Sequence, residues 1–250
     1  AGRIVEIKKE VVLTRKGLCN FSTALFAAED MEGRSDTMVR DERLTTYIRS
    51  LEGPEDPVIE QIEQEAAETY VPIIRKETQS FLKTLLMIKQ PSRVLEIGTA
   101  IGFSAILMSE YMPEGGQIIT VEKYEKRIPI ARENFRRAGK EGQITLIEGD
   151  ALAVMQALDG SFDLIFMDAA KGQYIRYLPE AVRLLSDGGV LVSDNVLQDG
   201  DVIESRFAVE RRNRTIHSRM REYLYELKHH ERLLTSILPL GDGVALSVKC

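Results

Sequence analysis

Apolar residues from position 92 onward gather in short continuous runs, which alternate with segments of helical periodicity. Such runs predict strands that are buried on both faces, and the amphipathic segments between them predict helices. The predicted strands cover residues 93–98, 117–123, 143–150, 162–168 and 188–195. Strands that are separated by helices build a parallel sheet with helices on both faces, so the pattern predicts an α/β fold.

The pattern changes at both ends of this region. Residues 236–249 form two apolar runs around a Gly-Asp-Gly turn with no helix between them, which predicts an antiparallel hairpin. Ahead of the strands, residues 56–70 and 73–91 have apolar residues at helical spacing. Asp56 and Pro57 suit the start of the first helix, and Pro91 ends the second.

Residues 1–37 have no clear period, so they are either an N-terminal extension or a misassigned start, and residues 38–250 are predicted to form one domain. The formal net charge of −6 argues against a basic chain but allows a local basic patch. The only two cysteines, Cys19 and Cys250, predict a reducing cytoplasmic location without a disulfide framework. No apolar stretch is long enough to cross a membrane, and the N-terminus is too charged for a secretory signal.

The ends of the predicted strands carry the candidate chemistry, because ligands of parallel sheets bind beyond the carboxyl ends of the strands. The stretch "EIGTAIGFS" runs from Glu96 to Ser104, and its glycines Gly98 and Gly102 allow the backbone to approach a ligand closely. It is not the G-x-G-x-x-G motif of dinucleotide enzymes. An ordinary strand-to-helix turn is the alternative interpretation.

Two acidic residues end the second and third predicted strands. Glu122 is placed to accept hydrogen bonds from both hydroxyls of a ribose, although NAD enzymes also use an acid there. Asp150, which precedes Ala151, either accepts the exocyclic amine of an adenine or caps the next helix. These residues indicate a nucleoside-containing ligand and do not identify it.

Asp168 ends the fourth predicted strand, and Asp194 and Asn195 end the fifth. Because these strands are expected to be neighbours, the three side chains should share one crevice. Two carboxylates so close together repel each other unless a cation lies between them. Oxygen donors of this kind suit Mg²⁺, which keeps water positions open to a substrate. The alternative is that both acids cap helices or bond to loops.

Taken together, "LEIGTAIGFS", "TVEK", "EGDA", "MDAAKGQY", "SDN" and "LPLGDGVALS" resemble motifs of the cation-dependent class I O-methyltransferases, which include catechol and caffeoyl-CoA O-methyltransferases. The similarity covers roughly residues 55–249. "VPII", "EIGTAIG", "DAAKGQY" and "GDG" are most similar to the bacterial tRNA 5-hydroxyuridine methyltransferase branch. The resemblance implies a Rossmann-like fold whose seven-stranded, mostly parallel sheet ends in an antiparallel hairpin.

The resemblance also implies roles for individual residues. Asp168, Asp194 and Asn195 would bind the metal, and Lys171 would be the catalytic lysine beside Asp168; a solvated loop lysine is the alternative. The family's dimers make a homodimer the expected assembly. The implied contacts to S-adenosylmethionine are Ile74, Glu96, Gly98, Gly102, Ser104, Glu122, Asp150, Ala151 and Asp168.

The choice of acceptor depends on a cluster of arginines. Residues 206–221 contain six arginines and one acid, which suits phosphate recognition. A solvated helix face is the alternative, because Ile216, Met220, Leu224 and Leu227 form an apolar stripe. The candidate RNA-binding residues are Arg206, Arg211, Arg212 and Arg214.

The chain has no tryptophan to line a catechol pocket, and Tyr174 and Tyr177 are candidates either to stack on a base or to pack in the core. We therefore predict a Mg²⁺-dependent methyltransferase that converts wobble 5-hydroxyuridine in the tRNA anticodon loop to 5-methoxyuridine. The alternatives are a small catechol-like or CoA-linked phenolic acceptor, an NAD-dependent oxidoreductase and a non-catalytic RNA-binding protein. The missing third glycine and the carboxylate pair argue against the oxidoreductase.

Overall fold

The computed structural model describes residues 42–250, so the predicted extension at residues 1–37 lies outside the described residues. The strands are β1 (Arg93–Ile97), β2 (Gln117–Glu122), β3 (Ile144–Glu148), β4 (Phe162–Met167), β5 (Leu185–Ser193), β6 (Leu233–Leu238) and β7 (Val244–Lys249). The helices are α1 (Glu42–Ser50), α2 (Pro57–Glu68), α3 (Lys76–Lys89), α4 (Phe103–Glu110), α5 (Ile128–Arg137), α6 (Ala151–Ala157), α7 (Tyr174–Leu184) and α8 (Arg214–His229). Two short 3₁₀ helices, η2 (Lys171–Gln173) and η3 (Gln198–Ile203), precede α7 and α8.

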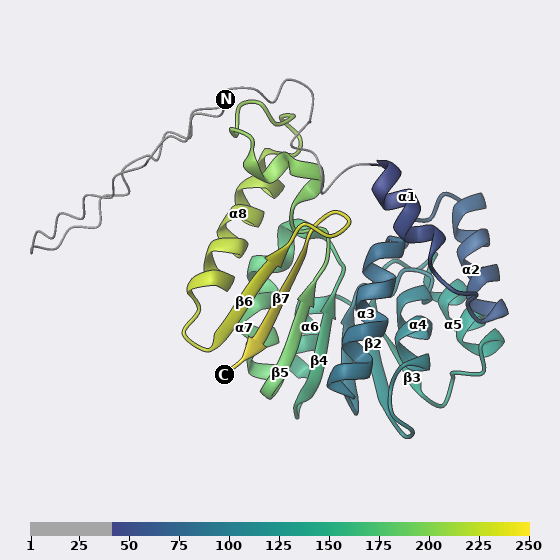
Figure 1. The fold of residues 1–250 in the computed structure, drawn as a ribbon. Coiled ribbons are helices and arrows are strands. Elements are labelled where there is room, and N and C mark those ends of the chain that lie inside the picture. Colours follow the sequence, from purple (N-terminus) through teal and green to yellow (C-terminus); the bar gives the residue numbers. More distant parts are fainter. Residues whose placement is uncertain (1–41) are drawn as a thin grey trace, which may run out of the picture. The chain divides into compact units, whose positions relative to one another are not determined.

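Within residues 42–250 the strands form one seven-stranded sheet in the order β3-β2-β1-β4-β5-β7-β6 (Figure 1). Neighbours from β3 to β5 pair in parallel, whereas β7 runs antiparallel to both β5 and β6. The predicted fold class, including the terminal hairpin, is confirmed. No helix among these residues has the length and apolar character needed to span a bilayer.

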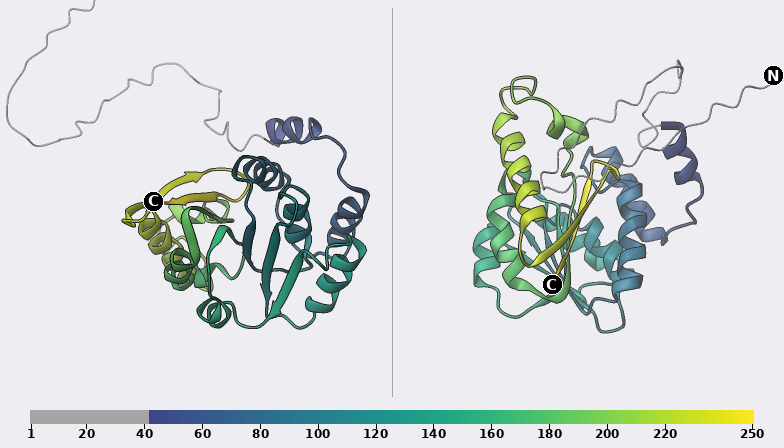
Figure 2. Two further views of the ribbon diagram at one scale, coloured as in Figure 1. Left: turned by 90° about the horizontal axis from the view of Figure 1, so that it is seen from below. Right: turned by 60° about the vertical axis from the view of Figure 1, so that its left-hand side comes forward.

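Alternate residues of the central strands point to opposite faces of the sheet and build two apolar cores. Val94 and Phe166 pack on the face that is covered by α2, α3, α4 and α5. Leu95 and Met167 pack on the other face, which is covered by α6, α7 and α8. Figure 2 shows helices on both sides of the sheet. With both faces covered, the carboxyl edge of the sheet remains open for a ligand.

The helices ahead of the sheet follow their capping signals with one difference. Asp56 caps α2, because its Oδ1 accepts a hydrogen bond from the Val58 amide at 2.8 Å, and Pro57 is the first helical residue, as predicted. The second helix was predicted over residues 73–91 but begins at Lys76. The preceding residue, Arg75, is extended, and this segment lines the cavity described below instead of adding a helical turn.

Two strands begin earlier than predicted. The fifth was predicted from residue 188, but β5 begins at Leu185, which pairs with Phe162 ahead of an irregularity in the ladder. The glycine pair at 188–189 lies within the strand, as predicted. The first hairpin strand begins at Leu233, three residues before the predicted start.

Candidate active site

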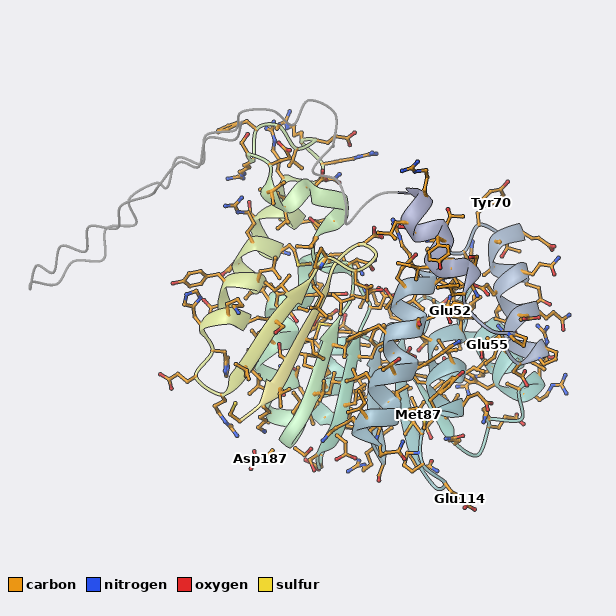
Figure 3. All side chains as sticks on the ribbon, in the orientation of Figure 1. Glu52, Glu55, Tyr70, Met87, Glu114 and Asp187 are labelled. Atoms are coloured by element: carbon orange, nitrogen blue, oxygen red, sulfur yellow. The ribbon has the colours of Figure 1, made fainter. Side chains whose placement is uncertain are left out.

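A cavity of about 650 Å³ lies at the carboxyl edge of the parallel strands. In Figure 3, Glu114 and Asp187 mark the lower end of the sheet. Tyr70, which shortly precedes the cavity segment Pro72–Arg75, lies high in the same view. The volume is in the range of small-molecule sites. The predicted site residues on its wall are Ile74, Gly98, Glu122, Ala151, Asp168, Lys171, Asp194 and Asn195.

Four predicted cofactor contacts lie off the cavity wall: Glu96, Gly102, Ser104 and Asp150. Glu96 is fully buried, and its two carboxylate oxygens accept hydrogen bonds from Ser104 Oγ and Thr120 Oγ1, both at 2.5 Å. This network joins β1, β2 and α4 behind the glycine turn. Glu96 and Ser104 therefore support the glycine turn from behind, and their contact with S-adenosylmethionine stays a prediction.

The two glycines of the turn serve different purposes. Gly98 has φ +104°, and a Cβ there would lie 2.1 Å from the carbonyl oxygen of Asp168, so glycine lets β1 approach the end of β4. Gly102 has φ +85°, and a Cβ there would meet the Phe135 ring at 2.5 Å. Gly102 thus allows α4 and α5 to pack, and its close approach to a ligand stays a prediction.

Glu122 occupies the predicted position at the end of β2 and is fixed by backbone amides. Its Oε2 accepts from the Ala100 amide at 2.8 Å, and its Oε1 accepts from the amides of Lys123 and Tyr124 at 2.9 and 2.8 Å. Asp150 caps α6, because its Oδ1 accepts from the Leu152 amide at 3.1 Å. The capping alternative for Asp150 is confirmed, and its contact with adenine stays a prediction.

Two of the three predicted metal ligands, Asp168 and Asn195, meet around the ammonium group of Lys171. Lys171 Nζ lies 2.7 Å from Asp168 Oδ1 and 2.5 Å from Asn195 Oδ1. Asp194 is the first residue after β5. It is 1% exposed, and its Oδ1 accepts a hydrogen bond from the Asn195 amide at 2.8 Å. The oxygens of Asp168 and Asn195 therefore already converge on one positive charge.

Burial disfavours the charged form of Asp194 in this cluster. Desolvation, followed by repulsion from Asp168, raises the pKa of Asp194 to about 7. Within residues 42–250, no three His, Cys, Asp or Glu side chains form a metal-binding group, so the Asn195 amide would have to complete the ligand set. Two carboxylates and an amide oxygen are hard donors that fit Mg²⁺. The donor set thus fits a divalent cation.

Asp242 and Arg75 are site residues that the sequence analysis missed. Asn195 Nδ2 donates to Asp242 Oδ2 at 3.2 Å, which turns the amide oxygen of Asn195 toward Lys171. Asp242 is in turn paired with Arg75 at 2.5 Å. The sequence signal was the acid inside the Gly-Asp-Gly turn, which had been interpreted only as a hairpin connection. Asn195 itself has φ +56°, a conformation that asparagine tolerates.

The two tyrosines after Lys171 differ in position. Tyr174 is fully buried and lies off the cavity wall, which favours packing of its ring in the core over stacking on a base. Tyr177 is 5% exposed but lines the cavity, which leaves both alternatives open for it.

The arginine cluster is partly structural. Arg212 pairs with Glu210 at 2.6 Å, and Arg214 donates to the carbonyl oxygens of Phe207 and Val209, both at 3.2 Å. Arg214 therefore holds the loop that precedes α8. The apolar stripe predicted for this helix is present, since Met220 and Leu227 are fully buried and Ile216 and Leu224 are partly buried.

Two further arginines of the cluster also serve the fold. Arg219 donates to the carbonyl oxygen of Gly172 at 3.1 Å, which fastens η2, and Arg221 donates to the carbonyl oxygen of Val202 at 3.1 Å. The predicted phosphate-binding surface is consequently narrower than the six arginines implied.

The buried acid Glu96 predicts a pH dependence of stability. Desolvation raises the pKa of Glu96 from 4.5 to about 7. The folded protein holds this proton more tightly than the unfolded chain, so the free energy of unfolding should fall by about 3 kcal/mol as pH rises from 4.5 through 7. The Glu96→Gln variant should lose that part of the slope, measured by urea unfolding across this range. Parallel slopes for the two proteins would contradict it.

Comparison with known proteins agrees with this geometry. A model of the O-methyltransferase family matches residues 49–250. Catechol O-methyltransferase of Niastella koreensis is 35% identical over 169 residues, which cover 65% of this chain and 76% of that protein. Caffeoyl-CoA O-methyltransferase 2 of Populus trichocarpa is 31% identical over 180 residues, which cover 66% of this chain and 70% of that protein.

Among solved structures, the O-methyltransferase from Bacillus cereus in complex with SAH superposes with a TM-score of 0.74 and 27% identity. The match covers 83% of this chain and 97% of the Bacillus cereus chain. The family resemblance predicted from the motifs is confirmed, while the tRNA branch stays a prediction. The chain belongs to the O-methyltransferase family, and its fold is that of the S-adenosylmethionine-dependent O-methyltransferases.

Proposed function

We propose that this protein transfers the methyl group of S-adenosylmethionine to one of two adjacent oxygens of an acceptor, with a divalent cation bound by Asp168, Asp194 and Asn195. One observation carries the proposal: the oxygens of Asp168 and Asn195 converge on the ammonium group of Lys171 at the wall of a cavity that also holds Glu122. S-Adenosylmethionine supplies a methyl group that is activated by its sulfonium. A bound divalent cation supplies charge that orients the acceptor and lowers the pKa of its hydroxyl.

The chain's own residues bind the donor and move the proton. Glu122, at the end of β2, accepts hydrogen bonds from the ribose hydroxyls of the donor, because its carboxylate is held by backbone amides on the cavity wall. Ile74 and Ala151 lend apolar surface to the same cavity. Lys171 is the proposed acceptor of the proton of the acceptor hydroxyl, because its Nζ lies among the proposed metal ligands.

Replacement of Glu122 by alanine should weaken S-adenosylmethionine binding by about tenfold to a hundredfold, since hydrogen bonds to a charged group contribute roughly 1.5–3 kcal/mol. Calorimetric titration measures this affinity. Glu148→Ala is the matched control, because Glu148 pairs with Glu122 in the adjacent strand, bonds to Arg132 and lies off the cavity wall. Equal affinities in the wild type and Glu122→Ala would remove Glu122 from the donor site.

For the acceptor we propose wobble 5-hydroxyuridine in tRNA, whose hydroxyl and neighbouring ring carbonyl form an adjacent oxygen pair. The proposal is supported by the motif resemblance and by the loop before α8. There Arg206 and Arg211 are exposed and make no ion pair or hydrogen bond within residues 42–250, and Phe207 beside them is 84% exposed. Exposed arginines and an aromatic ring suit the phosphates and unstacked bases of an anticodon loop. A tRNA acceptor implies a cytoplasmic enzyme, and a homodimer is the assembly we expect from the family.

A small phenolic acceptor is the second candidate, favoured by the names of the relatives. Those relatives are a catechol O-methyltransferase and caffeoyl-CoA O-methyltransferases. The same site would take two adjacent phenolic oxygens of a catechol.

Incubation with labelled S-adenosylmethionine, Mg²⁺ and undermodified total tRNA, followed by nucleoside analysis, tests the acceptor. We expect labelled 5-methoxyuridine, and we expect Arg206→Ala with Arg211→Ala to reduce tRNA transfer and its salt dependence. Label transfer to catechol but not to tRNA would select the phenolic candidate. Transfer to neither acceptor, with no donor binding, would contradict the proposed reaction.

A further inference from the structure

The hydroxyl of Tyr174 lies where Lys171 meets the tips of β4 and β5. Its oxygen is 3.1 Å from Lys171 Nζ and 3.3 Å from the Ala169 amide. It is also 3.0 Å from the carbonyl oxygen of Met167 and 3.2 Å from that of Asp194. This buried group therefore contacts both strand tips and the proposed catalytic lysine.

Local structure fixes this contact. Lys171 opens η2 and Tyr174 follows three residues later, and residues at this spacing in a 3₁₀ turn lie on the same side. The Tyr174 ring packs edge-on against Tyr223, with ring centres 5.4 Å apart and an interplanar angle of 74°. Tyr223 is itself anchored by a 2.6 Å hydrogen bond to Ser193. The ring of Tyr174 is consequently held in the core.

The hydrogen-bonding capacity of the hydroxyl sets its direction. A tyrosine hydroxyl has one proton to donate and two lone pairs to accept with. The hydroxyl donates its proton to the carbonyl oxygen of Met167 or of Asp194. Its lone pairs therefore accept hydrogen bonds from the Ala169 amide and from Lys171. Tyr174 is thus an acceptor for Lys171 whichever carbonyl it bonds.

We propose that Tyr174 is a positioning residue that holds Lys171 in place when a divalent cation takes the oxygens of Asp168 and Asn195. The inference rests on the proposed function. Among the described residues, Lys171 Nζ has three oxygen partners, and two of them are the proposed metal ligands Asp168 and Asn195. The third partner, the hydroxyl of Tyr174, is not one of the proposed metal ligands.

Removal of the hydroxyl should make the ammonium group compete with the cation. In Tyr174→Phe the ring remains, but of the oxygens within residues 42–250 that bond to Lys171 Nζ, only those of Asp168 and Asn195 are left. Loss of a hydrogen bond to a charged group corresponds to about a tenfold change. We therefore expect Mn²⁺ to bind about tenfold more weakly and kcat to fall about tenfold, with the KM for S-adenosylmethionine unchanged.

A double-mutant cycle separates positioning of Lys171 from general support of the strand tips. Mn²⁺ is titrated by calorimetry into metal-free wild type, Tyr174→Phe, Lys171→Met and the double variant. The inference predicts that Tyr174→Phe has no effect on Mn²⁺ affinity or kcat once Lys171 is methionine. The same tenfold loss in both backgrounds would overturn it, because the hydroxyl would then act through the backbone carbonyls alone.

Controls keep the result interpretable. Tyr223→Phe removes a hydroxyl from the same cluster without touching Lys171 and should leave Mn²⁺ affinity within about twofold of wild type. Lys171→Met alone should bind Mn²⁺ more tightly than wild type, and weaker binding would overturn the inference even if Tyr174→Phe fails to fold. Absence of Mn²⁺ binding by wild type would overturn the proposed metal site and this inference with it, whereas equal losses in the cycle overturn only the role of Tyr174.

Discussion

Replacing Asp168 by alanine is expected to lower methyl transfer on the order of a thousandfold, since a cation at such a site supplies several kcal/mol of transition-state stabilisation. Asp168 is both a proposed metal ligand and a partner of Lys171 at 2.7 Å. The fold should survive, because the contact that joins β4 to β1 here is the Asp168 amide to the Ile97 carbonyl at 2.9 Å. Transfer of labelled methyl, together with urea unfolding, measures both effects.

Asp187→Ala is the matched control for this variant. Asp187 lies on β5, the same strand that leads to Asp194, but at the lower end of the sheet in Figure 3, and its side chain is 85% exposed. Its replacement should leave turnover unchanged. Wild-type turnover in Asp168→Ala, or equal losses in the two variants, would refute the ligand assignment.

Replacing Lys171 by methionine should lower kcat by about a hundredfold to ten-thousandfold, the usual contribution of a positioned general base. Methionine keeps most of the side-chain length while removing the nitrogen that lies between Asp168 and Asn195. S-Adenosylmethionine affinity should be retained, because Glu122, the proposed donor contact, ends β2, which is separated from β4 by β1. Single-turnover methyl transfer at saturating donor and Mg²⁺ measures the chemical step.

The control for this change is Lys126→Met, an exposed lysine that lies off the cavity wall and should have no effect. A Lys171→Met enzyme that keeps its wild-type kcat would show that another group removes the proton. Loss of donor binding in the same variant would instead indicate a wider disturbance of the cavity.

The sheet and much of the site followed from the sequence because both depend on local patterns. Short apolar runs gave the parallel strands, and the residues that end them, Glu122, Asp168 and Asp194, reached one cavity because parallel strands share a carboxyl edge. Asn195 was placed by its adjacency to Asp194. These predictions required no knowledge of distant contacts.

What the sequence could not give depends on contacts between segments far apart in the chain. Asp242 reaches Asn195 only because the hairpin folds back beside β5, and no periodicity reports that. The family resemblance implied that Glu96 contacts the donor, and the sequence did not show that its carboxylate oxygens accept hydrogen bonds from the hydroxyls of Ser104 and Thr120. Side chains alternate between the two faces of a strand, and this alternation decides which way Glu96 points. The near-continuous apolar run of β1 gives no sign of it in the sequence.

The arginine cluster shows the same difficulty. Charge density alone favoured an RNA surface, yet Arg219 and Arg221 donate to carbonyl oxygens within the fold. The path of the loop before α8 decides which arginines are left to contact a nucleic acid. Amino-acid composition does not encode that path.

Mn²⁺ titration of metal-free protein, followed by electron paramagnetic resonance, tests the central claim without assuming an acceptor. If Asp168, Asp194 and Asn195 form a cation site, wild type should bind Mn²⁺ at a specific site, and Mg²⁺ should displace it. Asp168→Ala should lose that binding while retaining S-adenosylmethionine affinity. Equal Mn²⁺ binding by the two proteins, or none by wild type, would contradict the claim.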